Sequence, residues 1–596
     1  MSQRPIRIAN CAGFANDRSN SIREILDGDP VDVINGDYLA EVTLAGAAGR
    51  RNSGRPDGLS NLLISQLQTC LDDILERGIK LVVNAGGFDP AGCAERVRQI
   101  ATARPVKVAH VVGDDLLDRL DELQRAGHDL RNLDTGEPFS SWGHPVSSAN
   151  AYLGGWGIAD ALAGGADVVV CGRVTDASLT FGPAAWWHGW STDDWDRLAG
   201  AVVAGHIIEC GPHATGGNFS GFTRVAKLVR PGFPIAEIDE TGATVITKQA
   251  GTDGVVDRDT VTAQLLYEIQ GLIYLNPDVA VDLSTVELRS DGEDRVLVHG
   301  ATGGPPPSTT KVAITAITGW ENSINLFLCG LDIEEKAALI EAQARDALAG
   351  SEVELVRVDR IGTAAQNPST IDEATVLLRL LARSSNEKAL QPSRFFRDVH
   401  STVLGSIPGF HTDGLGYRNT RAAPLLEYWP GMLPVSELEH TVVHSDGARQ
   451  AARAPAAFAS GPIESRAKWP TDVAYGSGWL GSDVETLTVP LGQVTHARAG
   501  DKGGNSNVGI WATDEAAWPW LRELLTEERL RELLPEVANL RITRDELPHL
   551  WAVHFVLHGF LGLGASSNGR QDALGKTVGE FLRARHVPVP RVLLGS

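Results

Sequence analysis

The feature that most constrains the fold of this chain is a repeated alternation of short apolar runs, polar loops and helical stretches over its first 180 residues. Val, Ile and Ala dominate the apolar runs without polar alternation, which is typical of parallel strands covered on both faces. The predicted strands are 6–11, 31–35, 80–84, 106–112 and 166–171, and the predicted helices are 59–77, 91–102 and 150–163. This order predicts a doubly wound, mostly parallel α/β sheet with right-handed crossovers.

Length and charge narrow the class of protein. The chain has 596 residues, whereas one domain usually has roughly 100–200, so we expect several domains. Its 53 Lys and Arg against 75 Asp and Glu give a net charge of −22, which argues against a nucleic-acid or anionic-membrane surface. It has no apolar run of about 18 residues and no signal-peptide pattern at its start. Six scattered cysteines without a CxxC motif indicate reduced thiols, so we expect a cytoplasmic protein.

The composition predicts four regions. Residues 1–222 form the doubly wound domain, and residues 223–446 form a mixed α/β region that completes the core, with a predicted helix at 371–382. The Ala-, Gly-, Ser- and Pro-rich residues 447–482 predict a linker. Strands and helices resume over residues 483–596, which suffice for a small α+β domain.

Polar loops follow the predicted parallel strands, where a doubly wound sheet binds its ligands. They carry Asp37 and Glu41, then Asn84 with Gly86 and Gly87, and then Arg173 with Asp176. Each loop alone also suits a turn or a helix cap, but several at one edge favour a binding cleft. Asn84 and the Gly–Gly backbone could bind a carboxylate, thioester or phosphate oxygen. Arg173 could bind an anionic substrate, or pair with Asp176 or Asp37 instead.

None of these loops matches the dinucleotide fingerprint, GxGxxG with an acid about 20 residues on, and the sequence contains no GxxxxGK[ST] pattern. The sequence therefore disfavours a nucleotide-driven kinase and a simple dehydrogenase.

The densest combination of reactive groups is the stretch 205–219. Glu209, Cys210 and His213 lie within five residues, and Gly216, Gly217 and Asn218 follow them. Such a group can act as a general acid and base, as a thiolate nucleophile or as part of a metal site. Because the HxxxH spacing of many metal sites is missing, a helix end packed beside a glycine turn stays open as the alternative.

A second dense cluster lies between residues 498 and 507. It includes Asp501, Lys502 and Asn507 among several glycines, a composition that suits an anion or carbonyl site with Lys502 as the cation. A hairpin turn with a surface ion pair is the alternative. His554 and His558 follow beside an apolar run, where histidines are more often packed core residues than ligands.

Taken in order, these motifs resemble the acyclic terpene utilisation family. The matching stretches are "NGDYLAE", "VVNAGGFDP", "GGADVVVCGRVTDASL", "AGHIIECGPHATGGNF", "TVTAQLLYEI" and "YLNPDV". The later "ARAGDKGGNSNVGI" and "FVLHGFLGLGASSNGRQDALGK" resemble the ferredoxin-like module that is fused to many members. At Asp89 and at Gly504 the sequence differs from the pattern that is common in this family, which argues against an obligatory role for these two residues. The glycine at 504 also weakens a metal interpretation of its loop.

The resemblance implies a role in bacterial growth on acyclic terpenoids, where neighbouring steps act on branched acyl-CoA thioesters. The family motifs fall here on Asp37, Glu41, Asn84, Gly86, Gly87, Arg173, Asp176, Glu209, Cys210, Gly216, Gly217, Asn218, Asp501, Lys502 and Asn507.

Residues and resemblance together favour an enzyme acting on a branched carbonyl-containing acid or its CoA thioester by C–C lyase or hydratase chemistry. In this hypothesis Glu209 or His213 is the acid/base group and Cys210 a second proton donor. Asn84 and Asn218, with the Gly–Gly backbones, would hold an oxyanion. The predicted substrate-binding residues are Asp37, Glu41, Gly86, Gly87, Arg173, Asp176, Gly216, Gly217, Asp501, Lys502 and Asn507.

Two alternatives remain open at this point. One is a metal-dependent hydrolase that uses Asp37, Glu209 and His213, and the other is a non-catalytic subunit or scaffold of an acyl-CoA carboxylase or lyase system. The expected partners are a small carboxylate or an acyl-CoA, with no nucleic acid and no membrane, and a further copy of the chain in a homo-oligomer. CoA is expected only as part of the substrate, and a divalent metal only in the hydrolase alternative.

Overall fold

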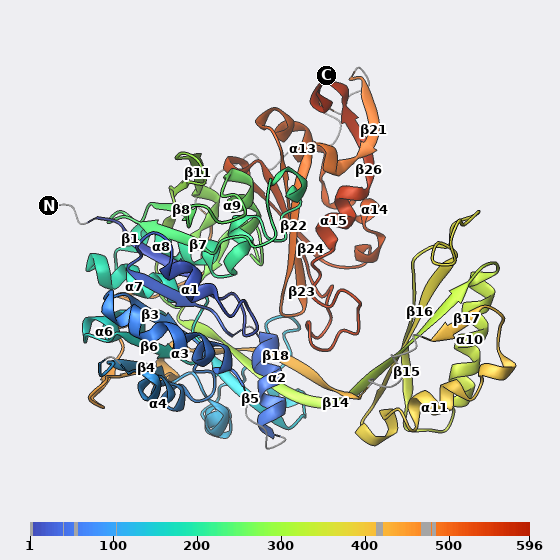
Figure 1. Cartoon of the computed structure of the whole chain (residues 1–596), viewed down its shortest axis with the longest axis horizontal. Coiled ribbons are helices and arrows are strands. Elements are labelled where there is room, and N and C mark those ends of the chain that lie inside the picture. Colours follow the sequence, from blue (N-terminus) through green and yellow to red (C-terminus); the bar gives the residue numbers. More distant parts are fainter. Residues whose placement is uncertain are drawn as a thin grey trace.

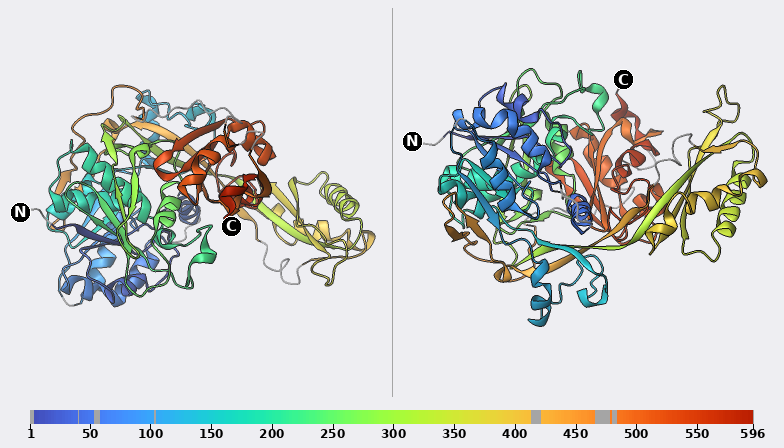
Figure 2. Two further views of the ribbon diagram at one scale, coloured as in Figure 1. Left: turned by 90° about the horizontal axis from the view of Figure 1, so that it is seen from above. Right: turned by 60° about the horizontal axis from the view of Figure 1, so that its bottom comes forward.

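The computed structural model describes residues 4–39, 41–52, 58–102, 104–412, 421–465, 478–479 and 484–595, and of Glu41, Val42 and Asn52 only the backbone. Three parts are visible in Figures 1 and 2: a body (residues 4–319 and 421–465), a lobe (320–412) that projects from it, and a C-terminal module (484–595). Over these described residues, no helix combines the length and the apolar character needed to cross a bilayer.

An eleven-stranded sheet, counted over the described residues, organises the body. Its parallel part is β1 (Ile6–Asn10), β2 (Val33–Gly36), β3 (Lys80–Val83), β6 (Val168–Cys171) and β4 (Val108–Val112), in that spatial order. Antiparallel strands extend both edges: β7 (Pro234–Ile238), β8 (Thr244–Lys248), β12 (Val296–His299) and β11 (Glu287–Ser290) beyond β1, and β19 (Thr441–Val443) and β20 (Arg449–Ala451) beyond β4. The predicted α/β class is confirmed, and the sheet continues across residue 222 because β7 pairs with β1.

Helices cover both faces of the parallel strands. One face packs against α1 (Ser21–Leu26), α3 (Asn61–Glu76) and α4 (Pro90–Ile100), and the other against α6 (Trp156–Ala163), α7 (Ser178–His188) and α8 (Trp195–Ile208). Because side chains alternate along a strand, successive residues pack on opposite faces of the sheet. Val33, for example, belongs to one apolar cluster and Ile34 to the other. This arrangement is the doubly wound fold that the continuous apolar runs predict.

Helix starts follow local chemistry. At α4, Asp89 accepts a hydrogen bond from the Gly92 N–H (2.8 Å) and Pro90 occupies the first turn, a capping arrangement that satisfies otherwise unpaired N–H groups. The start of α6 is capped from a distant segment, because the Gly155 N–H donates to Oδ2 of the buried Asp278 (2.8 Å).

Two predicted helices are wrong in part or in full. Residue 150 does not begin a helix but lies in β5 (Val146–Ala151), which pairs with β14 (Thr309–Cys329), and α6 starts only at Trp156. The predicted helix 371–382 is largely the strand β16 (Thr375–Ser384). Its leucines favour a helix by propensity, but pairing with β14 on one side and β15 (Glu354–Ile361) on the other makes it an inner strand.

The long strand β14 belongs to two parts of the molecule. Its first half pairs with β5 and with β18 (Ala423–Pro434), and its second half pairs with β16 and β17 (Phe410–Thr412) in the lobe. The helices α10 (Ile333–Ala347) and α11 (Phe395–His400) pack on one face of the lobe sheet and complete a separate apolar core. Sequence positions 223–446 are therefore divided between the body and the lobe.

The segment between α8 and β14 contains elements that border the site described below. They are α9 (Arg258–Leu265) and a small sheet of β9 (Ile273–Leu275), β10 (Ala280–Asp282) and β13 (Thr302–Gly304). Of the predicted linker 447–482, the described residues up to 465 run along the body, where β20 pairs with β19 and Arg453 Nε donates to Asp160 Oδ1 (2.6 Å).

The C-terminal module is a four-stranded antiparallel sheet in the order β22 (Thr495–Lys502), β23 (Asn505–Ala512), β25 (Ala552–Leu557) and β24 (Ile542–Leu547). It is covered by α13 (Trp518–Leu524), α14 (Glu527–Leu533) and α15 (Val578–Ala584), and β21 (Thr486–Pro490) pairs with β26 (His586–Pro590) beside it. The predicted ferredoxin-like α+β module is thus present.

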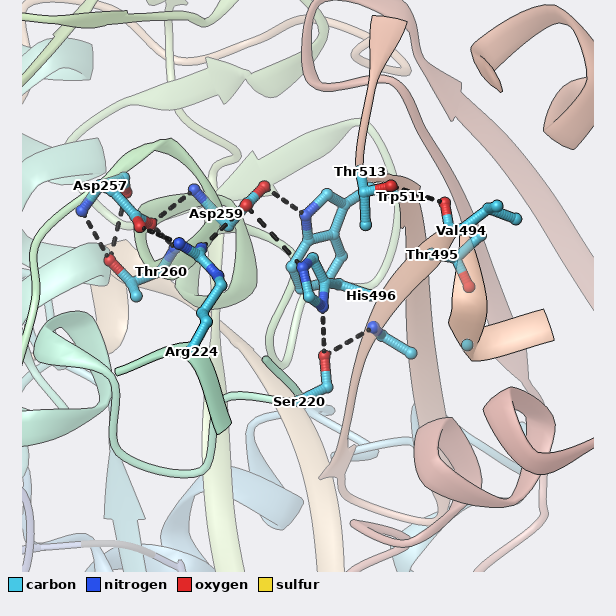
Figure 3. A network of polar contacts seen from close by, with 12 residues as sticks. Ser220, Arg224, Asp257, Asp259, Thr260, Val494, Thr495, His496, Trp511 and Thr513 are labelled. Atoms are coloured by element: carbon cyan, nitrogen blue, oxygen red, sulfur yellow. Dashed lines mark hydrogen bonds and ion pairs between the residues drawn. The ribbon is translucent and has the colours of Figure 1, made fainter. Parts of the chain in front are cut away.

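A network of polar contacts docks the module onto the body (Figure 3). Ser220 Oγ lies 3.1 Å from His496 Nδ1, and Trp511 Nε1 donates to Asp259 Oδ1 (3.0 Å). The Trp511 side chain is also part of the apolar core of the body. Burial lowers the pKa of His496 to about 4, so this contact forms with the neutral imidazole at neutral pH.

Candidate active site

A cavity of about 450 Å³ lies where the body, the strands β14 and β18 and the C-terminal module meet. This volume is in the range of small-molecule sites. Its lining includes residues from the body and from the C-terminal module: Tyr152, Thr175, Asp176, Glu268, Tyr274, Leu275, Pro277, Pro307, Lys311, Pro430, Met432, Lys502, Arg541 and His558.

The loop after β6 places a buried arginine behind the wall of this cavity, next to the lining residue Asp176. Arg173 is 1% exposed, and its Nη2 forms an ion pair with Asp176 Oδ1 at 2.9 Å. Nη1 donates to the Leu39 carbonyl, and the guanidinium carbon lies 4.2 Å from the centre of the Tyr152 ring. Of the roles considered for Arg173, the ion pair with Asp176 is the one that the structure contains.

The loop after β2 adds a second buried carboxyl. Asn84 Nδ2 donates to Asp37 Oδ1 (2.7 Å), while Asn84 Oδ1 accepts from the Tyr38 N–H (2.6 Å). Burial raises the pKa of Asp37 well above its usual range, Asp176 raises it further, and Arg173 opposes this shift. Asn84 therefore positions Asp37.

The structure does not support the oxyanion role predicted for Asn84 and the Gly–Gly turn, because none of these residues lines the cavity. The Gly86 N–H donates to the Cys171 carbonyl (3.1 Å), and the Gly87 N–H donates to the Asn84 carbonyl (3.3 Å). Gly86 is needed for packing, because a Cβ there would lie 2.5 Å from the Cys171 oxygen. These contacts shape the loop and engage the N–H groups of both glycines.

Glu209, which directly follows α8, is a third buried carboxyl. Burial raises its pKa well above the usual range, and Asp176 adds to the shift while Lys502 opposes it. Its Oε1 lies 3.6 Å from His206 Nδ1, and its Oε2 has no hydrogen-bond partner in the described part of the chain. The pKa of His206 is lowered to about 4 by burial. Burial therefore favours the protonated form of Glu209, and the imidazole beside it is neutral at neutral pH.

Tyr274 connects this buried pair to the cavity. Its ring centre lies 4.9 Å from that of His206, and Tyr274 lines the cavity whereas His206 and Glu209 do not. Burial and the nearby Glu209 raise the pKa of the Tyr274 hydroxyl well above its ordinary value, so it remains a hydrogen-bond donor at neutral pH.

The predicted cluster of Glu209, Cys210 and His213 is divided in the structure. His213 accepts from Arg498 Nη2 at Nδ1 (3.0 Å), and its Nε2 lies 2.6 Å from Asn218 Nδ2. Burial and Arg498 lower the pKa of His213 well below its usual range. His213 and Asn218 thus join the body to the module, and neither lines the cavity, so the acid/base role of His213 and the oxyanion role of Asn218 are not supported.

Gly216 and Gly217 are engaged in backbone hydrogen bonds, and Cys210 is held as a thiol. The Gly216 and Gly217 N–H groups donate to the carbonyls of His213 (3.3 Å) and Pro212 (2.8 Å). Burial and Glu209 raise the pKa of Cys210 well above its usual value. Cys210 is therefore a protonated thiol rather than a ready nucleophile.

The hairpin of β22 and β23 brings a lysine into the cavity. Lys502 Nζ lies 3.2 Å from Glu268 Oε2, and both residues line the cavity. Asn507 holds this arrangement, because its Nδ2 donates to the Leu266 carbonyl (2.7 Å) and its Oδ1 accepts from the Glu268 N–H (3.1 Å). Asp501 lies beside Lys502 in β22 but not in the cavity wall, and the side chain of Glu41 is outside the described part of the chain.

Four cavity residues escaped the sequence analysis: Glu268, Tyr274, Lys311 and Arg541. Glu268 and Tyr274 fall within the stretches "TVTAQLLYEI" and "YLNPDV", which carried the signal without pointing to single residues. Lys311, whose Nζ lies 4.2 Å from the centre of the Tyr152 ring, lies outside the quoted motifs. Arg541 has no motif that marks it either, whereas His558, which the sequence favours as a packed core residue, lines the cavity.

The residues named for a metal-dependent hydrolase do not form one site. His213 is engaged by Arg498, away from the cavity that Asp176 lines. Throughout the described ranges, no group of three or more His, Cys, Asp or Glu side chains is arranged to hold a metal ion.

Comparison with known proteins adds two findings. A profile of the acyclic terpene utilisation family protein AtuA matches residues 6–444, and a profile of the AtuA ferredoxin-like domain matches residues 489–588. Neither the curated proteins nor the solved structures that were compared give a match. The two matched segments meet at the cavity, since Asp176 belongs to the first and Lys502 to the second.

Proposed function

We propose, because this chain belongs to the acyclic terpene utilisation family, that it is an enzyme acting on a branched carbonyl-containing acid or its CoA thioester. The reaction class would be hydration or C–C cleavage next to the carbonyl. Such reactions move a proton at the α-carbon and pass through an enolate, so they need an acid/base pair and a group that stabilises a developing oxyanion.

The observation that carries this proposal is the grouping of carboxyls behind the cavity wall. Asp176 forms the ion pair with Arg173, while burial and Asp176 itself raise the pKa of Glu209. Two carboxyls that interact electrostatically but lie in different surroundings are the usual arrangement of an acid and a base in one site. Proton transfer to a ligand would pass through Asp176 or Tyr274, since these two line the cavity.

Cations on the same wall suit the oxyanion. Lys502 and Lys311 both line the cavity, and a positive charge near a developing enolate lowers its energy most in a water-poor site. The apolar part of the wall, formed by Leu275, Pro277, Pro307, Pro430 and Met432, suits a branched hydrocarbon chain. The cavity therefore offers a charged end for the carbonyl and an apolar surface for the chain.

Exchange of the α-hydrogens of isovaleryl-CoA for solvent deuterium, followed by mass spectrometry, tests this proposal without knowledge of the complete reaction. We expect the wild-type protein to catalyse exchange, and the substitutions Asp176→Asn and Glu209→Gln to slow it about 100-fold or more, as loss of acid/base catalysis usually does. The exposed Asp121, which is not part of the cavity lining, provides the matched control Asp121→Asn.

Exchange that is equal in all four proteins would refute the assignment. Repeating the assay after dialysis against EDTA separates the metal-dependent alternative, in which activity would be lost and then restored by a divalent ion.

A further inference from the structure

One cation of the cavity wall is exposed and has no acidic partner. Arg541 lines the cavity from the start of β24, and in the described part of the chain it forms no ion pair with a carboxylate. Lys502, in contrast, is paired with Glu268. Leu133 and Leu275 of the same wall are 52% and 55% exposed. These exposed members mark the mouth of the cavity and place Arg541 there.

The guanidinium of Arg541 is held in a fixed position. Its Nη2 donates to His558 Nδ1 (2.9 Å), and His558 Nε2 lies 2.8 Å from Thr543 Oγ1. Burial and Arg541 lower the pKa of His558, so the imidazole is neutral at neutral pH. With Nδ1 accepting from Arg541, it keeps its proton on Nε2 for the threonine. The remaining N–H groups of Arg541 are left for a ligand at the mouth.

The size of the cavity limits what it can enclose. About 450 Å³ accommodates a branched acyl group and the atoms next to the thioester, but not a whole coenzyme A, whose phosphates and nucleotide must then lie outside the mouth. Because the chain carries a net charge of −22, a polyanionic ligand needs a local cation at the place where it leaves the protein.

We propose that Arg541 binds a phosphate of the ligand at the mouth of the cavity and thereby makes a coenzyme A thioester, rather than a free acid, the preferred substrate form. The inference rests on the proposed function, because it assumes that the acyl end occupies the cavity. His558 and Thr543 act as positioning residues for Arg541. A planar guanidinium is well suited to this task, since it binds phosphate oxygens in a bidentate manner.

The test compares thioesters with and without the 3′-phospho-ADP part of coenzyme A, which carries all the phosphates. Isothermal titration calorimetry with isovaleryl-CoA and with S-isovaleryl-pantetheine measures the contribution of this part for each variant of the full-length chain. We expect wild type to bind the CoA thioester about five-fold more tightly, the gain typical of one exposed charge pair. Arg541→Leu should reduce this ratio to about one, and Arg541→Lys should keep most of it. The control Arg585→Leu removes an exposed arginine that does not line the cavity.

Each outcome decides between the claims. Equal affinities of wild type for both thioesters, or a ratio that survives in Arg541→Leu, would overturn the role of Arg541 while leaving the acyl site intact. Binding of free isovalerate in preference to both thioesters would also overturn it. If none of the three probes binds, the proposed function itself fails and the inference fails with it.

Discussion

Asp278 provides a quantitative test of how the body is held together. This carboxyl is 3% exposed and accepts the Gly155 N–H at the start of α6, and burial raises its pKa to about 7. An unfolded chain would titrate near 3.8. Because the folded pKa is raised, the native state binds this proton more tightly. The contribution of Asp278 to the free energy of unfolding is therefore largest below pH 4, and this contribution is lost as the pH rises toward 7.

The difference of about three pKa units corresponds to roughly 4 kcal/mol once the pH exceeds 7. For cooperative unfolding of 596 residues, the transition entropy is roughly 1.3 kcal/mol/K, so this energy corresponds to about 3 °C in Tm. Asp278→Asn removes the titration but keeps an oxygen for the Gly155 N–H. We expect the variant to melt close to wild type at pH 4 and about 3 °C higher at pH 8.

Differential scanning calorimetry between pH 4 and pH 8 measures this change, with Asp121→Asn as an exposed control whose offset from wild type should not vary with pH. Parallel profiles for Asp278→Asn and wild type would show that Asp278 is not buried in the way the structure indicates. A variant that loses stability at high pH would show that the ionised carboxylate stabilises α6 more than burial opposes it.

Three further predictions concern the loops around the site. Asn507→Leu leaves the Leu266 carbonyl and the Glu268 N–H without their partner, which should lower the free energy of unfolding by about 2–5 kcal/mol. Hydrogen exchange at residues 266–268 should then be faster, and unchanged deuterium uptake there would show that Asn507 does not hold this segment. Gly86→Ala should lower the free energy of unfolding by about 1–3 kcal/mol, because its Cβ would approach the Cys171 oxygen, whereas Gly405→Ala, with open space around it, should have little effect. Cys210 should react with iodoacetamide at pH 8 more slowly than Cys329, since its pKa is raised; faster labelling would refute this.

The sequence predicted the parallel strands well because burial on both faces leaves an unambiguous apolar run. The predicted strand 80–84, for example, corresponds to Lys80–Val83. The helix predicted at 371–382 failed for the opposite reason: the leucines at 377, 378, 380 and 381 fit a helix or an inner strand, and only the partners β14 and β15 decide between them. Pairing over a long sequence separation is not visible in the residues themselves.

The same limitation applies to the site. Asp176 and Lys502 were among the predicted residues and line the cavity, whereas His213, predicted as a catalytic group, is occupied by Arg498. Sequence proximity suggested that His213 acts with Glu209, but the turn after α8 directs the two side chains toward different neighbours. Arg541 could not be found, because its importance comes only from the position of the module against the body.

The strand β14 has a mechanical consequence for the lobe. Pairing of β14 with β5 ends at Ala316, and pairing with β16 begins only at Trp320. Between these points, within the described residues, β14 pairs with β18 alone, and the register between these two strands shifts by one residue. A narrow ribbon with a bulge bends more easily than a wide sheet. Residues 317–319 therefore form a hinge between the body and the lobe. The orientation of the lobe relative to the module is fixed by two hydrogen bonds, in which Arg379 and Arg383 donate to the carbonyls of Gly569 and Ser567. If these two hydrogen bonds break, the lobe can rotate about the hinge as a rigid unit while its own apolar core stays folded.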